Sequence, residues 1–388
     1  MLFYAYGVVT VPMEETLGLT RAATSSAFSL ALLTSGLAAW SAGRHVDRRG
    51  ARGLMTLGSI IGALLVFAWS FVQTLPQLLV VQAGIGLAIA AVTYDVAFTV
   101  LARWFRRDRM RAILLVTLAA GFASTIFVPL TTLLTEAWGW RAALRALALL
   151  LLVVTAPLHA LTLRRDPRDL GLAPDGTHDE DPGDPARDRT EEPTVTLHGA
   201  VRRAPFWWLT TAFALDTMAL LAIAAHAVPL LLERGQPASL VALAVGSIGA
   251  WQVAGRLVFA PATERVPLRT LTIVTYLTRA VSLALILAMP GLTGMFLFAS
   301  LFGLANGAST LARAGIVAEV FGARHYGAIN GAMSGLVVPL RVAAPLAVGA
   351  LRTSTGGYDL ALAIGIVIVA LAALAVAQVT SRPPLRPA

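Results

Sequence analysis

The sequence predicts an all-α integral membrane protein with 12 transmembrane helices, arranged as two six-helix bundles. Of its 388 residues, 57% are hydrophobic and 13% are charged, and this charged share is about half that of a soluble domain. The apolar residues fall in blocks of about 20 or more, the length that a helix needs to cross a bilayer. One strongly charged stretch in the middle of the chain separates the blocks into two sets.

The first half supplies six predicted spans. Residues 1–13 are apolar but too short for a full span, and this run meets Pro12, Glu14 and Glu15. The other five spans are apolar throughout and are joined by connections of only a few residues, as in a compact helical bundle. They are residues 24–43, 53–75, 77–103, 112–135 and 142–163.

Residues 164–203 differ completely from the spans before them. This segment is rich in acidic residues, proline and arginine, and such a composition has little to bury. We expect a solvated tether, in preference to a regulatory tail, between an N-terminal bundle (1–163) and a C-terminal bundle (204–388). The second bundle would contain six spans, at residues 205–232, 239–261, 268–289, 292–318, 327–350 and 358–380.

An internal repeat relates the two halves. Asp47-Arg48 has a counterpart in Glu264-Arg265, and Phe105 has one in Phe321, both at nearly the same shift. Parallel repeats of this kind occur in secondary transporters. The repeat also places the expected start of the first span before Met1. We therefore expect that the native start lies upstream, or that the chain is a truncated product.

Arginine placement predicts the orientation in the membrane. All 30 basic residues are arginines, and they gather in the loop at residues 43–52, in the loop at 103–111 and in the linker. These three regions lie on one side if the spans alternate, so the positive-inside rule places both termini and the linker in the cytoplasm. The protein would be a multi-pass protein of the cytoplasmic (inner) membrane. The arginines sit at the edges of apolar blocks, which fits membrane topology better than nucleic-acid binding.

Catalytic chemistry is not predicted. The chain has no cysteine, which excludes disulfides, thiolate metal sites and cysteine nucleophiles. It also has no phosphate-binding loop, no metal-ligand cluster and no nucleophile–base pair. We therefore expect no enzyme activity, no cofactor and no metal.

The loop from Gly43 to Arg52 reads Gly-x-x-x-Asp-Arg-x-Gly-x-Arg between two apolar helices. This pattern resembles the loop signature of the major facilitator superfamily of secondary transporters. The resemblance implies the major facilitator fold, two pseudo-symmetric six-helix bundles that rock about a central site. It also implies that Asp47 and nearby arginines latch the halves on the cytoplasmic face in the outward-open state. The implied conformational gate comprises Gly43, Asp47, Arg48, Gly50, Arg52, Glu264 and Arg265.

Several further stretches resemble the bacterial branch related to monocarboxylate transporters and the oxalate/formate antiporter. In that branch an arginine of the eighth helix engages the substrate carboxylate, and Arg256 matches it by position. Gln252 stands where the animal members carry an aspartate, a departure from proton-coupled lactate symport. The stretches are Leu19-Thr20-Arg21-Ala22, Arg103-Trp104-Phe105, Gly139-Trp140-Arg141, Asp169-Leu170-Gly171-Leu172 and Gly255-Arg256.

Ionisable residues inside spans are candidates for function, because each costs at least about 2.5 kcal/mol at mid-depth. Arg341 lies between Pro339 and Pro345, and we expect it either to contact substrate or to pair with an acid such as Asp216. Arg256 lies nearer a helix end and could snorkel to the interface. A guanidinium suits a carboxylate because two parallel N–H donors meet two oxygens.

The remaining candidates have two interpretations each. Asp216 and Asp95 are either proton-coupling groups or fixed charge partners. Arg279 and Arg313 are expected to be structural. Cavity-lining roles are assigned to Tyr94, Trp251 and Asn306.

These observations predict a secondary active transporter for a small organic anion, driven by a proton or counter-substrate gradient. Its partners would be the anionic substrate, the lipid bilayer and H⁺, with no nucleic acid, and it would act as a monomer. One alternative is a drug or solute exporter of the same fold, although its fifth span has only Gly121 and Pro129 of the glycines and prolines typical of exporters. Another alternative is a non-transporting membrane receptor on this scaffold.

Overall fold

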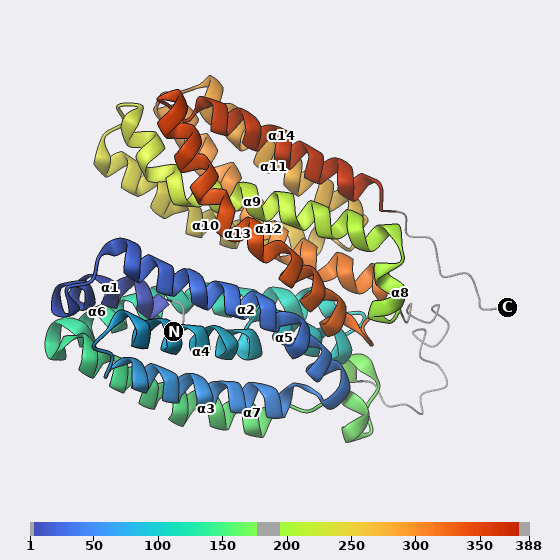
Figure 1. Cartoon of the computed structure of the whole chain (residues 1–388). Coiled ribbons are helices and arrows are strands. Elements are labelled where there is room, and N and C mark those ends of the chain that lie inside the picture. Colours follow the sequence, from blue (N-terminus) through green and yellow to red (C-terminus); the bar gives the residue numbers. More distant parts are fainter. Residues whose placement is uncertain (1–3, 177–194, 380–388) are drawn as a thin grey trace. The chain divides into compact units, whose positions relative to one another are not determined.

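The computed structural model describes residues 4–176 and 195–379, and helices joined by short turns make up most of these residues (Figure 1). The predicted all-helical membrane class is confirmed. The chain separates into two compact units. Unit 1 contains Met1–Arg109, Ala119–Glu191 and Ala323–Val338, and unit 2 contains Met110–Leu118, Glu192–Gly322 and Pro339–Ala388.

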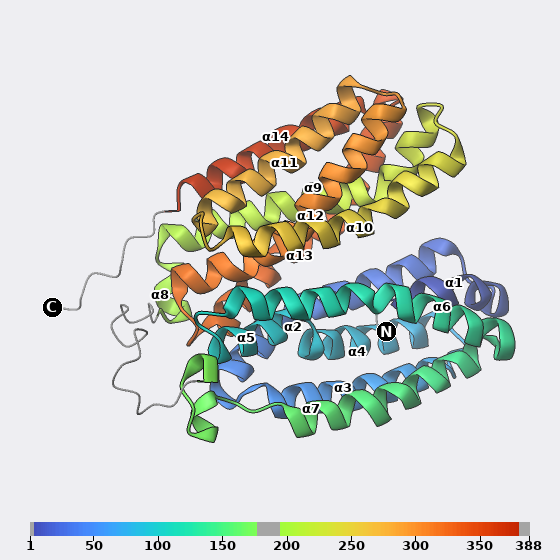
Figure 2. The same ribbon diagram turned by 180° about the vertical axis from the view of Figure 1, so that it is seen from behind.

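Unit 1 is built mainly from the first half of the chain. In both views α3 lies beside α4 and α7 (Figures 1 and 2). The core of unit 1 includes the buried side chains of Met13, Trp69, Leu78 and Leu144. Its helices are α1 (Tyr4–Leu17), α2 (Arg21–Arg49), α3 (Ala51–Trp69), α4 (Leu75–Val92), α5 (Tyr94–Trp104), most of α6 (Arg109–Leu150) and α7 (Ala156–Thr162).

The helix ends of unit 1 follow from local chemistry. The Thr20 hydroxyl accepts the N–H of Ala23 at 3.3 Å and caps the start of α2. Gly50 has φ 82° and connects α2 directly to α3, a conformation that glycine adopts without a steric penalty. A second glycine, Gly139 with φ 77°, interrupts α6. This break separates the predicted fifth and sixth spans near the predicted position.

The predicted fourth span, residues 77–103, is two helices in the structure. α4 ends at Val92 and α5 begins at Tyr94, while Thr93 between them is extended. Neither glycine nor proline marks this break in the sequence. Asp95 in the first turn of α5 is bonded to side chains of the distant helix α13, so tertiary contacts hold the break in place.

Unit 2 is built mainly from the second half of the chain. α12 packs against α10 and α11, and α14 packs against α9 and α11 (Figure 2). A Cβ at Gly255 or Gly307 would overlap the backbone of the facing helix, so small residues allow α10 and α12 to approach closely. The helices are α8 (Leu197–Val201), α9 (Ala204–Glu233), α10 (Ala238–Ala262), α11 (Leu268–Ala288), α12 (Leu292–Phe321), α13 (Tyr326–Thr355) and α14 (Asp359–Ala377).

Two helices contribute to both units. The first part of α13 belongs to unit 1, and its remainder, from Pro339 onward, belongs to unit 2. Likewise residues 110–118 at the start of α6 belong to unit 2. The internal repeat places these two segments at equivalent positions. Each unit therefore corresponds to one half of the sequence, except that the starts of α6 and α13 each belong to the unit of the other half.

Nine helical runs in the described part of the chain are long and apolar enough to span a membrane. One of them, Arg109–Thr162, contains the Gly139 break and therefore corresponds to two predicted spans. The predicted spans at 1–13 and 24–43 correspond to α1 and α2, which are not among the nine. α1 has only 14 residues, and α2 ends in a strongly charged turn.

The predicted tether is folded at its start. Pro167–Leu170 forms a 3₁₀ turn capped by Asp166. The Asp175 carboxylate then accepts the backbone N–H groups of Arg106 and Arg107 at 3.0 and 2.8 Å. This part of the linker is therefore folded, while most of its residues stay exposed or half-exposed and Pro167 is buried. The acidic stretch from residue 177 to 194 lies outside the described residues.

Candidate functional site

The gate predicted from residues 43–52 centres on Asp47. The expected loop was wrong here, because α2 continues to Arg49 and Asp47 lies in its last turn. Its Oδ2 accepts the backbone N–H of Ala328 at 2.7 Å, and its Oδ1 accepts that of Gly327 at 3.1 Å. Both N–H groups belong to the first turn of α13, where helical N–H groups have no partner within the helix. The carboxylate therefore caps α13 and interacts favourably with its positive end. Gly43 is required nearby, because a Cβ would overlap the Gly327 carbonyl group.

Arg103, at the end of α5, also contacts Asp47. Its Nη2 donates to the Asp47 carbonyl oxygen at 2.6 Å and lies 3.5 Å from the Asp47 carboxylate. The same nitrogen donates to the Arg324 carbonyl oxygen at 3.2 Å, just before α13. The sequence placed Arg103 in a family motif but gave it no role in the gate. Its position in Arg103-Trp104-Phe105, at the end of a span, was the available signal.

Burial dominates the electrostatics of Asp47, whose side chain is only 4% exposed. Burial raises the pKa of Asp47 to about 6, although the N–H groups of Ala328 and Gly327 and the charge of Arg103 act in the opposite direction. Desolvation thus disfavours the charged carboxylate, and the three contacts offset this effect only in part. Its protonation state changes close to neutral pH.

The other predicted gate residues have different environments. Gly50 has a positive φ and connects α2 to α3, whereas Arg48, Arg52 and Arg265 are exposed. Glu264 accepts a hydrogen bond from Arg111 in the first turn of α6 at 3.1 Å, and both side chains are largely exposed. Asp47, in the last turn of α2, and Glu264, in the turn after α10, therefore each contact the first turn of a helix from the opposite sequence half.

Asp95 makes a second contact with α13. Its Oδ1 accepts a hydrogen bond from the Asn330 amide at 2.7 Å, and its Oδ2 accepts one from the Ser334 hydroxyl at 3.2 Å. Both partners are neutral, and Asp95 itself is half-buried. The adjacent Tyr94 is partly exposed and stacks on Phe98 at 5.2 Å.

Asp216 has a fixed charge partner. Arg279 is fully buried on α11, and its Nη1 donates to both the carboxylate and the carbonyl oxygen of Asp216 on α9. Its Nη2 donates to the Ser309 hydroxyl at 3.3 Å. From the sequence, Arg279 is expected to be structural, but Arg341, and not Arg279, is the candidate partner of Asp216. In addition, the Arg313 guanidinium lies 5.1 Å from the centroid of the Phe213 ring.

Arg256 is a buried cation with an incomplete set of contacts. It is 7% exposed, and its Nη1 donates to the Thr117 carbonyl oxygen at 2.9 Å. Within the described residues its Nε has no hydrogen-bond partner, and no carboxylate forms an ion pair with it. Thr117 lies in the part of α6 that belongs to unit 2.

The other predicted substrate residues are distributed as follows. Trp251 shares α10 with Arg256 and is partly exposed, with its Cβ facing Gly303 of α12. Asn306 lies on α12 and Arg341 on α13, and both are half-buried. Unit 2 therefore carries four of the five, whereas Tyr94 belongs to unit 1.

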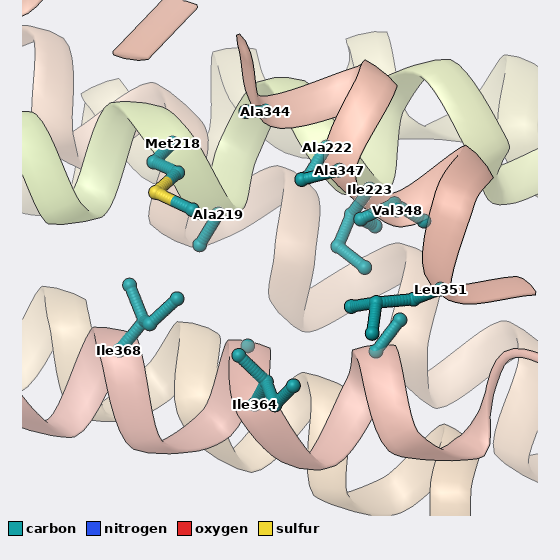
Figure 3. Close-up of a pocket in the computed structure, with 12 residues that line it drawn as sticks. Met218, Ala219, Ala222, Ile223, Ala344, Ala347, Val348, Leu351, Ile364 and Ile368 are labelled. Carbon is teal, nitrogen blue, oxygen red and sulfur yellow. The ribbon is translucent and has the colours of Figure 1, made fainter. Parts of the chain in front are cut away.

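The small cavity within unit 2 is not lined by any of the five predicted substrate residues. It lies between α9, α13 and α14, and its volume of about 40 Å³ is too small for an organic solute (Figure 3). Its walls are apolar and include Met218, Ile223, Val348 and Ile368. Within the described residues no group of histidine, aspartate and glutamate side chains could hold a metal ion.

Comparison with known proteins identifies relatives along most of the chain. A model described as Major Facilitator Superfamily matches residues 1–251. An uncharacterized 38 kDa protein in the 23S RNA operon of Thermoproteus tenax is 28% identical over 330 residues, which cover 84% of this chain and 78% of that protein. Monocarboxylate transporter 12 of Rattus norvegicus is 27% identical over 332 residues, covering 79% and 66%.

Solved structures show the same fold. A crystal structure of the E. coli fucose:proton symporter FucP matches with a TM-score of 0.71 and 13% identity, covering 97% of this chain and 95% of that chain. FucP in the outward conformation matches with a TM-score of 0.67 and 14% identity, covering 97% and 96%. The predicted major facilitator fold is confirmed. Both the family and the fold are those of transporters and not of enzymes.

Proposed function

The chain belongs to the Major Facilitator Superfamily, and on that premise we propose that it moves a small organic anion, a carboxylate, by secondary active transport. Alternating access carries the anion across the cytoplasmic membrane, driven by a proton or counter-substrate gradient. The chain acts as a monomer, with both termini and the linker on the cytoplasmic side.

Arg256 is the observation that supports an anionic substrate most strongly. A buried guanidinium loses its hydration, and an isolated buried charge is very costly unless an anion or several acceptors compensate it. The Thr117 carbonyl oxygen supplies one acceptor, and Nε still lacks one. A carboxylate offers two oxygens in the geometry that a guanidinium prefers.

The charge pattern on neighbouring helices agrees with this assignment. Asp216 is an acid within the spans of the second half, and it already forms an ion pair with Arg279. Asp216 is therefore engaged elsewhere, and the substrate would supply the missing counter-charge of Arg256. We assign Arg341 as a second substrate contact. Tyr94, Trp251 and Asn306 are proposed to line the path.

One relative points to the same substrate class. The name monocarboxylate transporter 12 describes a protein that shares 27% identity with this chain. Gln252 lies one helical turn before Arg256 on α10, so a carboxylate site here would lack an acid at that position. This difference favours a coupling arrangement other than an aspartate beside the substrate arginine.

We assign proton coupling to Asp95 in preference to Asp216. The partners of Asp95 are the neutral side chains of Asn330 and Ser334, so its charge can change without leaving a buried cation unpaired. Protonation of Asp216 would leave the buried Arg279 without its counter-charge, which is costly. Asp216 is therefore the structural member of the two.

Uptake of labelled mono- and dicarboxylates into proteoliposomes, with and without a pH gradient, tests the substrate class. We expect saturable uptake of at least one carboxylate and a clear decrease in the Arg341→Ala variant. Equal transport by the two proteins would remove Arg341 from the site. If no carboxylate is transported, the substrate class is wrong, and an exporter or a receptor on this fold becomes the better explanation.

A further inference from the structure

Two arginines of α6 lie together at the end of α3, at the opposite end of that helix from the Asp47 loop. Nη1 of Arg141 donates to the carbonyl oxygens of Ser70 and Val72 at 2.7 and 3.0 Å. Nε of Arg145 donates to the Ser70 hydroxyl at 3.2 Å. α3 has 19 residues and is therefore about 28 Å long, close to the thickness of the hydrocarbon core. The arginine pair thus lies near one membrane boundary.

Aromatic rings hold both guanidinium groups in place. The Arg141 guanidinium lies 4.3 Å from the centroid of the Trp140 ring, and that of Arg145 lies 4.8 Å from the centroid of the Phe71 ring. Cation–π contacts of this kind stabilise the cation and fix its orientation. The two cations are therefore positioned before any ligand arrives.

The pair has no counter-charge within the described residues. No carboxylate there forms an ion pair or hydrogen bond with Arg141 or Arg145, including that of Glu136 on the same helix. Comparable arginines in unit 2 are neutralised, since Arg234 pairs with Asp359 and Arg352 pairs with Glu233. Two guanidinium groups one helical turn apart repel each other, so an anion between them would be stabilising.

The surroundings of Arg145 are those of a lipid-facing surface. Arg145 is exposed, and the neighbouring side chains of Phe71, Trp138 and Leu149 are 53, 65 and 61% exposed. Tryptophan is enriched at the headgroup level of membranes. Arg145 is five residues beyond Trp140, or about 7 Å along the helix, so its long side chain can reach back to the headgroups.

We propose that Arg141 and Arg145 bind the phosphate of an anionic phospholipid in the leaflet at the end of α3 that is remote from Asp47. The planar guanidinium fork matches phosphate oxygens, and two such groups favour a headgroup with net negative charge. The acyl chains then cover the exposed apolar side chains of Phe71 and Leu149. A lipid explains both the uncompensated charge and the apolar surface beside it, whereas a soluble anion explains only the charge.

The equivalent position in unit 2 lacks this feature. Gly356, like Gly139, has φ 77° and precedes the last predicted span of its half. The helix that follows it, α14, contains no arginine and begins with Asp359, which is paired with Arg234. The lipid site is therefore specific to unit 1 and is not a general consequence of the repeated fold.

Native mass spectrometry of the purified full chain, titrated in neutral detergent with phosphatidylglycerol or phosphatidylcholine, tests the proposal. We expect one tightly bound phosphatidylglycerol in the wild type and about tenfold weaker binding in Arg145→Gln, the loss expected for one charged hydrogen bond. Arg145→Lys should be intermediate, because it keeps the charge but loses the planar fork. Arg141 remains in all these variants to hold the end of α3.

Arg352→Gln is the matched control, because it removes one exposed arginine that already has a partner in Glu233. It should bind phosphatidylglycerol as the wild type does. Equal binding by wild type and Arg145→Gln would overturn the proposal, as would an equal loss in Arg352→Gln. Displacement of the lipid by millimolar inorganic phosphate would also overturn it, by indicating a soluble-anion site.

Discussion

The Asp47 carboxylate accepts the backbone N–H of Ala328 at 2.7 Å, across a sequence separation of 281 residues. An acid in the last turn of α2, in the first repeat, thereby caps a helix of the second. Glu264, its counterpart in the second repeat, contacts Arg111 in the first turn of α6. The repeat that is weak in sequence is therefore visible as a pair of equivalent contacts. The two differ in strength, because an exposed ion pair contributes only about 0–1 kcal/mol.

Asp47→Asn should slow turnover while leaving substrate affinity largely intact. The substitution replaces one acceptor oxygen of the cap by an NH₂ group, so one of the two N–H groups of α13 loses its acceptor. An unpaired buried donor costs about 1–3 kcal/mol, or roughly fivefold or more in a population. Initial uptake rates over a range of substrate concentrations would separate kcat from KM. Glu264→Gln, at the exposed counterpart, should change either constant by only a small factor. A large affinity loss with normal turnover in Asp47→Asn would contradict a gating role.

The cap on α13 should depend on pH near neutrality. Burial raises the pKa of Asp47 to about 6, above the value of about 3.9 for an exposed aspartate. The buried arrangement therefore binds the proton more tightly than an opened one. Relative to the opened arrangement, the buried one is stabilised progressively as the pH falls from about 6 towards about 3.9, and this stabilisation is absent at higher pH. Arg103 stays charged, and the pKa of His325 is lowered by burial and by Arg324 and Arg103.

Hydrogen exchange of the Ala328 amide would measure this dependence. After correction for intrinsic exchange, we expect greater protection at pH 5 than at pH 8 in the wild type. The difference should disappear in Asp47→Asn, which has no carboxyl group to titrate. Identical protection at the two pH values in the wild type would show that opening of the cap does not involve proton release by Asp47.

Asp216→Asn should destabilise unit 2 by about 3–5 kcal/mol, because it leaves the fully buried Arg279 without its partner. Replacing both residues by leucine should recover much of this loss, since apolar pairs often substitute well for buried ion pairs. Thermal unfolding in detergent would compare the three proteins, with Glu264→Gln as an exposed-pair control. A fully stable Asp216→Asn that has lost only its response to a pH gradient would instead assign proton coupling to Asp216.

Asp95→Asn should uncouple transport from the pH gradient without unfolding the chain. The amide can keep one hydrogen bond to Asn330 or Ser334 but cannot take up a proton. We expect substrate exchange at equal pH to persist, while uptake driven by a pH gradient falls to the undriven level. Gradient-driven uptake by Asp95→Asn at the wild-type rate would exclude this residue from proton coupling.

The membrane fold was accessible from sequence because the apolar blocks and the Gly43–Arg52 pattern are local signals. The features that were missed depend on distant partners. No local residue marks the break at Thr93, which is held by contacts of Asp95 with α13. The choice of Arg279 as the partner of Asp216 likewise depends on which faces of α9 and α11 meet. The folded start of the linker depends on the hydrogen bond that the Asp175 carboxylate accepts from the backbone N–H of Arg106, just after α5.

The central proposal is that Arg256 binds the substrate carboxylate, and the concentration dependence of carboxylate uptake by Arg256→Gln in proteoliposomes tests it most directly. Arg265→Gln, which removes an exposed arginine after the end of the same helix, is the matched control. We predict that KM rises about tenfold or more in Arg256→Gln, as expected for losing a charged hydrogen bond, and is unchanged in Arg265→Gln. An unchanged KM in a correctly folded Arg256→Gln would contradict the proposal.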